Sequence, residues 1–380
     1  MKTRAVSLGL AVAVVAMWAA PADAQLGGLS KIAKGASTVK KLSDIKVTDE
    51  EEHQIGQEVS DKVVEAFGVY QDANVTKYVT LVGAVLAQAS PRPNIDWQFV
   101  VLDTDGVNAF AAPGGFVHIT KGLLGLMKNE AELAGVLAHE IVHVTEKHTV
   151  NAIQKSNAFS AGTDAAGTGG GLARSVLLQI AQRAYSDILN NNFSRGDEDE
   201  ADEKGVQLAN KVGYAPTGLS SALNKLVERN KDVKEKNGLF ASHPQMKDRL
   251  ANIEKVIKQN RLAATATVQA RYAKNITFDA KPAAAIATVA EGSRGLAGGE
   301  EKKSDEAEKK EEPKKSGGLG SAFSKLKGGS SSENKQAQNV SSGGARGVNP
   351  DRDAVGGPNK KRVPVKIGPG DIAEFQKGIA

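Results

Sequence analysis

Two histidines and a glutamate within five consecutive residues have the types and spacing of a catalytic zinc site. The run is His139-Glu140-Ile141-Val142-His143. Residues four apart on a helix lie on one face, one turn apart, so both imidazoles can reach the same ion. Neutral imidazole is a good zinc ligand. Glu140 lies too far round the helix to join them easily as a ligand, and we expect it to face a water molecule on the metal.

A hydrolytic zinc site needs three protein ligands and one open position for water. We expect the third ligand in the acidic segment 193–202, which carries Asp197, Glu198, Asp199, Glu200 and Asp202. Glu198 and Asp202 are one turn apart on one face of a predicted helix, so one can bind zinc while the other accepts the Nδ1–H of a ligand histidine. Spacing alone leaves their roles open. The alternative is a solvated acidic helix start, which the helix dipole favours.

The elements that must position these residues follow from hydrophobic periodicity and turn signals. Asn129 followed by Glu132 resembles a capping box and predicts the start of the zinc helix. We expect the other helices at 50–67, 74–88, 172–189, 198–211, 216–228 and 246–259, and strands at 97–102, 107–111 and 116–120. The predicted fold is α+β, mostly helical, with a small sheet of about three strands at its edge.

The first 24 residues have the pattern of an export signal. Lys2 and Arg4 precede an apolar run, and Ala22-Asp23-Ala24 predicts cleavage before Gln25. A retained membrane anchor is the alternative, but the apolar run is shorter than the roughly 20 residues that a span needs. The chain has no cysteine, which fits the oxidising bacterial periplasm. Secretion beyond the cell is the other destination considered.

Composition divides the remaining chain into segments. We predict a linker at 25–45, a zinc metallopeptidase domain at 46–275, a low-complexity disordered tail at 276–362 and a short C-terminal segment of unknown role at 363–380. The tail holds a Lys/Glu block and Gly/Ser-rich sequence, which bury too little apolar area to offset the entropy cost of ordering. Segment 363–380 is predicted to form a short strand and a short helix.

Bulk properties exclude several classes of protein. The 380 residues are 40% hydrophobic and 4% aromatic, which excludes a polytopic membrane protein and a collagen-like rod. Without cysteine there is no disulfide scaffold, thiolate metal site, cysteine nucleophile or lipid-anchored N-terminal cysteine. The net charge of +5 arises from 49 basic and 44 acidic residues, a balance that gives no support for nucleic-acid binding.

Four motifs in the same order resemble the HtpX-like/CAAX prenyl protease family of zinc metallopeptidases, above all its soluble, exported bacterial members. The resemblance covers about residues 50–260. The motifs are His139–His143, Glu198-x-x-Ala201-Asp202, Asn108–Gly115 followed by Gly122-Leu-Leu, and His243-Pro244 with Arg249 six residues on. The resemblance implies a gluzincin-like domain with one zinc ion per chain, Glu198 as third ligand and Asp202 behind a ligand histidine.

The resemblance also implies roles for the other motif residues. Residues at the places of His243 and Arg249 lie near the active site in that family, so both are expected to join Glu140 as catalytic residues. His243 would either hydrogen-bond the tetrahedral intermediate or occupy the open zinc position and hold the enzyme latent; a plain loop turn is the alternative. In the wider zinc-peptidase group an Asn-Ala edge strand binds substrate backbone, which suggests Asn108 and Ala109. The alternative for that strand is ordinary core packing.

These residues together predict a zinc-dependent endopeptidase. Water on zinc has a pKa of about 7, and Glu140 would take its proton and pass it to the leaving amine. From the resemblance we expect misfolded envelope proteins as substrates, with peripheral association with the envelope and an oligomeric state that the sequence leaves open. The alternative is a chaperone-like or binding protein of the same fold, but a site without catalysis has no need of Glu140.

The remaining segments and histidines are assigned lesser roles. Residues 156–171 are Ala/Gly/Ser/Thr-rich and are predicted to form a mobile loop over the active site. His53, His118 and His148 are not expected to be ligands. His148, nine residues past His139, is placed on the opposite face of the zinc helix.

Overall fold

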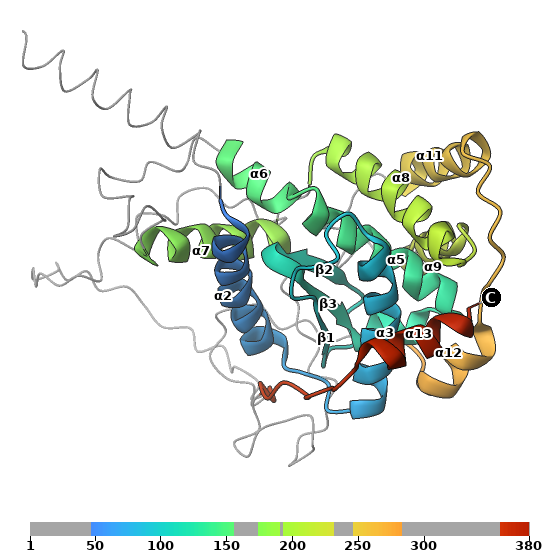
Figure 1. The fold of residues 1–380 in the computed structure, drawn as a ribbon, viewed down its shortest axis with the longest axis horizontal. Helices are drawn as coiled ribbons and strands as arrows, with labels where there is room; N and C mark the ends of the chain where they lie inside the picture. The colour runs from blue at the N-terminus through green and yellow to red at the C-terminus, as the bar shows by residue number, and fades with distance from the viewer. Residues whose placement is uncertain (1–46, 156–173, 191–192, 232–245, 283–357, 380) are drawn as a thin grey trace, which may run out of the picture. The chain divides into compact units, whose positions relative to one another are not determined.

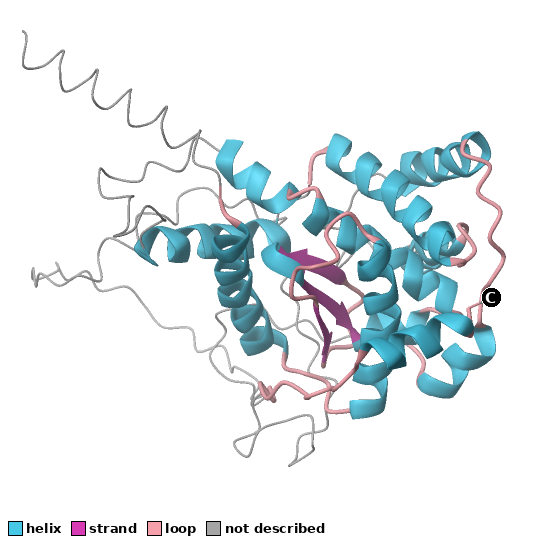
Figure 2. Ribbon diagram, in the orientation of Figure 1, coloured by secondary structure: helices cyan, strands magenta, loops and turns pink. Residues whose placement is uncertain are grey.

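The computed structural model describes residues 47–155, 174–190, 193–231, 246–282 and 358–379. These residues form a mostly helical structure around one small sheet, which confirms the predicted α+β class (Figure 2). The predicted export signal, the linker, the 156–171 loop, His243 and most of the predicted tail lie outside the described residues.

The three predicted strands and the predicted helices before residue 260 are present within a few residues of their expected bounds, whereas α4, α6 and α12 were not predicted. The strands are β1 (Gln98–Leu102), β2 (Ala109–Ala112) and β3 (Phe116–Thr120). The helices are α2 (Asp49–Phe67), α3 (Ala73–Ala89), α4 (Lys121–Leu126), α5 (Glu130–Thr145), α6 (His148–Lys155), α7 (Arg174–Asn190), α8 (Arg195–Val212), α9 (Gly218–Asn230), α11 (Met246–Gln259), α12 (Gln269–Asn275) and α13 (Pro369–Lys377).

The sheet has the strand order β1-β3-β2, with β1 parallel and β2 antiparallel to the central β3. A tight turn at Pro113–Gly115 joins β2 to β3. Gly114 and Gly115 have φ values of 72° and 102° there, a left-handed conformation that glycine adopts without steric cost. The turn is held against α2 because the Gly114 amide donates to Oε1 of Glu52 at 3.1 Å.

Helix α5 lies at the centre of the domain, between the sheet and helices α8 and α9 (Figure 1). Its N-cap is Asn129, whose side chain accepts from the Glu132 amide. Glu132 accepts in return from the Lys128 amide at 2.7 Å, so the predicted capping box is present in a variant form. Every α5 residue from Glu130 to Val144 is buried, which gives the side chains on this helix fixed surroundings.

A glycine allows α8 to approach α5 closely. A Cβ atom on Gly205 of α8 would lie 3.0 Å from the backbone nitrogen of His139 and 3.1 Å from its Cα. Since helix-to-helix distance depends on the side chains at the contact, Gly205 brings the acidic face of α8 next to the histidines of α5.

The C-terminal residues 358–379 pack against the same domain. The Val69 amide donates to the carbonyl of Asn359 at 2.7 Å, and Arg271 of α12 donates to the carbonyl of Phe375 at 3.0 Å. Helix α13 lies beside α3 and α12 in Figure 1, and its Ile372 is buried. The described structure therefore includes residues 276–282 and 358–362 of the predicted tail, and the predicted short helix within 363–380. The short strand predicted in this segment is wrong, because residues 363–367 form an irregular segment that pairs with no strand of the described sheet.

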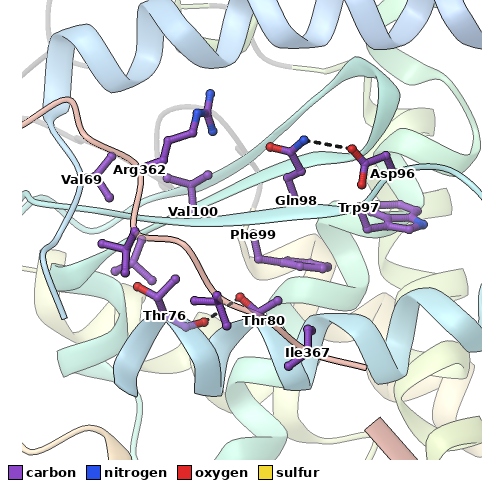
Figure 3. Close-up of a pocket in the computed structure, with 13 residues that line it drawn as sticks. Val69, Thr76, Thr80, Asp96, Trp97, Gln98, Phe99, Val100, Arg362 and Ile367 are labelled. Atoms are coloured by element: carbon purple, nitrogen blue, oxygen red, sulfur yellow. Dashed lines mark hydrogen bonds between the residues drawn. The ribbon is translucent and has the colours of Figure 1, made fainter. Parts of the chain in front are cut away.

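A cavity of about 320 Å³ separates part of this C-terminal segment from β1 and α3 (Figure 3). Val363, Val365 and Ile367 line one side of it, and Gln98 and Phe99 of β1 line another. None of its lining residues belongs to the predicted zinc site. Among the described residues, no helix is both long and apolar enough to cross a lipid bilayer.

Candidate metal centre

Three predicted ligands from two helices converge in the interior. Nε2 of His139 lies 3.1 Å from Nε2 of His143, one turn further along α5. Glu198 of α8 places Oε2 at 3.7 Å from His139 Nε2 and Oε1 at 3.5 Å from His143 Nε2. The three side chains are at most 2% exposed, and one ligand atom from each lies within 4.8 Å of the others.

These separations fit a single zinc ion. Ligand atoms bound tetrahedrally at 2.0–2.1 Å from zinc lie roughly 3.3 Å from one another. The donor set of two imidazoles and one carboxylate is also the set that leaves a fourth position open in hydrolytic zinc sites. Both the donor chemistry and the spacing of His139, His143 and Glu198 therefore suit zinc.

Asp202 contacts the far side of one of these histidines. Its Oδ1 lies 2.9 Å from Nδ1 of His139, whose other ring nitrogen faces Glu198. Helix α8 begins at Arg195 with a capping box between Ser194 and Asp197, so Glu198 and Asp202 occupy successive turns of one face. This arrangement matches the common pattern in which a carboxylate orients a metal-binding histidine.

Arg249 of α11 links the two carboxylates of α8. Its Nε and Nη2 donate to Oδ2 and Oδ1 of Asp202 at 2.8 and 2.7 Å, and its Nη1 lies 3.1 Å from Oε2 of Glu198. Burial by itself would raise the pKa of Asp202, but Arg249 outweighs it and lowers that pKa to about 2. The Asp202 carboxylate therefore stays ionised in the interior.

Glu140 is completely buried. Its carboxylate is close enough to Arg249 to help raise the pKa of that guanidinium, which burial alone would lower. Its orientation toward a metal-bound water molecule and its action as general base stay predictions.

The sequence analysis missed one histidine at this site. Helix α5 ends at Thr145, and Lys147 has a φ of 56°, so the helix is interrupted there and a separate helix, α6, starts at His148. The expected position of His148 on the opposite face of α5 is therefore wrong. Its Nδ1 lies 2.9 Å from Nδ1 of His143. The spacing of five residues after His143 was the available signal, but it was interpreted on an unbroken helix.

An aromatic ring also packs on His143. The Phe193 ring stacks against the His143 imidazole with centroids 4.0 Å apart and an interplanar angle of 25°. Phe193 directly precedes the Ser194 cap of α8, so the segment that delivers Glu198 also covers one face of a predicted ligand.

The predicted substrate strand lies at a sheet edge. Asn108 precedes β2, and its backbone bonds to Thr120 of β3: the Thr120 amide donates to the Asn108 carbonyl at 3.0 Å. Ala109 and the rest of β2 are buried, and both α5 and α7 contact the strand. Asn108 and Ala109 as substrate contacts stay a prediction, as does His243, which lies outside the described residues.

The described fold thus places paired histidines on one helix and a carboxylate on its neighbour, close enough to hold one metal ion. Residues 73–257, just under half of the chain, match the model of Peptidase family M48. The HtpX-like family name used above is thus approximate.

The curated relatives are proteases by name, and two of the three below are named metalloproteases. The beta-barrel assembly-enhancing protease of Yersinia pestis is 29% identical over 204 residues, covering 52% of this chain and 42% of the relative. Metalloprotease YcaL of Escherichia coli is 34% identical over 159 residues, covering 41% and 60%. Metalloprotease LoiP of Escherichia coli is 27% identical over 256 residues, covering 67% and 96%. The aligned region thus spans less than half of the Yersinia relative.

Proposed function

We propose that this chain is a zinc-dependent endopeptidase that hydrolyses polypeptides. The observation that carries the proposal is the convergence of His139, His143 and Glu198 within 4.8 Å, with Glu140 buried beside them. His139, His143 and Glu198 would hold one zinc ion. A zinc ion bound there activates water and polarises a substrate carbonyl.

The chain's own residues supply the remaining chemistry. Glu140 accepts the proton of the attacking water and delivers it to the leaving amine. Asp202 orients the His139 ring, and Arg249 holds Asp202 and Glu198 in place, which makes Arg249 a positioning residue. His243 is the candidate for contact with the reaction intermediate or for a latent state.

The location is inferred from residues 1–24, and the substrate from the names of the relatives. The pattern of residues 1–24 supports export, with the bacterial periplasm as the destination, and the names of relatives such as the beta-barrel assembly-enhancing protease support envelope proteins as substrates. Recovery of a mature chain beginning at Gln25 from the periplasmic fraction, measured by mass spectrometry, would support export. A chain retaining residues 1–24 in the cytoplasm would contradict it.

The deciding experiment compares Glu140→Gln with the wild type on casein, an unfolded polypeptide. The variant should bind zinc with unchanged stoichiometry and lose about 10²–10⁴-fold in cleavage rate, the usual contribution of a general base. Glu146→Gln is the matched control, because Glu146 follows the last turn of α5 and pairs with Lys204. Equal cleavage by Glu140→Gln and the wild type would refute the assigned role. Absence of cleavage by the wild type would favour the binding-protein alternative.

A further inference from the structure

We infer that His148 is a positioning residue for the zinc site. His148 holds the His143 ring in place through a hydrogen bond between the two imidazoles. This inference rests on the proposed zinc function and adds a residue that neither the sequence motif nor the family match assigns. His148 is 3% exposed and belongs to α6, a different helix from His143.

The orientation of His143 determines what His148 must do. Nε2 of His143 faces His139 and Glu198, so it is the nitrogen that would bind the metal. A neutral imidazole that uses the lone pair of Nε2 carries its proton on Nδ1. That Nδ1–H points at Nδ1 of His148, 2.9 Å away.

His148 can accept this hydrogen bond only in one tautomer. Its Nδ1 must offer a lone pair, so its proton must sit on Nε2. Nε2 of His148 lies 3.2 Å from Oε2 of Glu200, an acceptor that favours this tautomer. The acidic start of α8 therefore sets the proton position on His148, and His148 sets the ring orientation of His143.

The two predicted histidine ligands are thus held in parallel ways. Nδ1 of His139 faces Oδ1 of Asp202 at 2.9 Å, and Nδ1 of His143 faces Nδ1 of His148 at 2.9 Å. Groups that hydrogen-bond to a metal-binding histidine without binding the metal themselves fix the orientation of its ring. Their loss costs about 10–100-fold in metal affinity. Phe193 packs on the face of the same His143 ring and restricts its rotation further.

Two substitutions separate the hydrogen bond from simple packing. His148→Asn places an amide oxygen where Nδ1 stood and keeps an acceptor for His143. His148→Leu has similar bulk and no acceptor. His53→Leu is the control, because His53 lies on α2 and contacts Phe116 rather than any predicted ligand.

The measurement is the zinc dissociation constant of each full-length apoprotein, by competition with a chromogenic chelator. His148→Leu should bind zinc about 10–100-fold more weakly than the wild type, while His148→Asn and His53→Leu stay within about threefold. Equal weakening in the Asn and Leu variants, or unchanged affinity in His148→Leu, would overturn the inference.

A second measurement uses the wild type alone, so it tests the inference even if the His148 variants fail to fold. Long-range ¹H–¹⁵N correlation spectra of the zinc-loaded wild type should show His143 protonated at Nδ1 and His148 protonated at Nε2. A His148 proton on Nδ1 would overturn the inference and leave the proposed function standing. Failure of the wild type to bind zinc would overturn both.

Discussion

Nη1 of Arg249 lies 3.1 Å from Oε2 of Glu198, so a buried guanidinium contacts the carboxylate proposed as the third zinc ligand. The same guanidinium forms two hydrogen bonds with Asp202. Helix α11 therefore contributes to the site through one cationic side chain that contacts two buried carboxylates on α8. The proposed ligands are prearranged by residues that do not bind metal themselves.

Replacement of Arg249 should destabilise the apoprotein strongly. Arg249→Met leaves Asp202 and Glu198 buried without their cation, which costs about 3–5 kcal/mol of unfolding free energy. Arg249→Lys keeps the charge but loses the bidentate contact with Asp202, so this variant should lose less unfolding free energy than Arg249→Met. Urea unfolding of the metal-free proteins checks both values. The control Arg195→Met removes an exposed pair with Asp248 and should cost at most about 1 kcal/mol; equal costs for the Arg249 and Arg195 variants would contradict the prediction.

A methyl group on Gly205 should push α8 away from α5. Its Cβ would lie 3.0 Å from the backbone nitrogen of His139, and backbone atoms within a packed helix yield little, so Gly205→Ala should lose about 1–3 kcal/mol. Zinc affinity should fall as well, because Glu198 moves with α8. Calorimetric zinc titration and thermal unfolding measure the two effects.

Gly196→Ala provides the control in the same helix. A Cβ on Gly196 meets only the Ser194 side chain, at 3.8 Å, so this change should be neutral or stabilise by up to about 1 kcal/mol through helix propensity. If Gly205→Ala behaves like Gly196→Ala, close helix approach does not position the site.

Buried His118 should make the protein acid-sensitive. Burial, assisted by the charge of Arg362, lowers the pKa of His118 from 6.5 to about 3. Between these values the unfolded chain binds the proton and the folded protein does not, so stability falls as pH falls below 6.5. At pH 5 the loss from this group is about 2 kcal/mol.

The contribution of His118 is isolated by comparison with His118→Gln. An amide at this position can still bond Ser60, whose Oγ lies 2.8 Å from Nε2 of His118, but it does not titrate. The stability difference between wild type and variant should shift by about 2 kcal/mol between pH 7.5 and pH 5, measured by urea unfolding at each pH. A constant difference would show that His118 is not held neutral by the fold.

Zinc should raise the melting temperature of the wild type. A ligand at 100 times its dissociation constant stabilises the folded state by about 2.7 kcal/mol. The melting temperature should fall when a chelator removes the metal and return when zinc is restored. His139→Ala should lose this response, and magnesium should not replace zinc because it prefers oxygen ligands. An unchanged zinc response in His139→Ala would place the metal elsewhere.

The C-terminal helix should contribute to the stability of the whole domain. Ile372 of α13 is 9% exposed and packs in the main hydrophobic core, so Ile372→Ala should lose about 2 kcal/mol or more. The exposed Lys377 on the same helix gives the control Lys377→Ala, with an expected change within about 0.5 kcal/mol. If both variants unfold in a single transition and lose the same unfolding free energy, α13 adds nothing to the core.

Local patterns were sufficient to predict the features that lie within one element. His139 and His143 share a helix face, as do Glu198 and Asp202, and periodicity with caps gave the helix boundaries within a few residues. The predicted meeting of the two helices came from the order of the motifs and their resemblance to a family.

Features that depend on a break between helices or on distant contacts were not predictable in the same way. The turn at Lys147 uses a left-handed conformation without glycine, so nothing in the composition marked the end of α5. The partners of Arg249 lie 47 and 51 positions earlier in the chain. Helix α12 is short, and its Arg271 forms an ion pair with the buried Glu130 that no local pattern indicates.

Residues 358–379 pack on the same domain as residues 47–282, so the chain is part of this domain on both sides of residues 283–357. The backbone leaves the described structure after Pro282 and re-enters it at Pro358, held there by contacts such as Val69 with Asn359 and Arg271 with Phe375. A single cut between these points would leave two polypeptides joined without a covalent link. The smaller fragment, which carries residues 358–379, would then behave as a dissociable subunit. The fraction of it that stays bound to the larger fragment would fall on dilution.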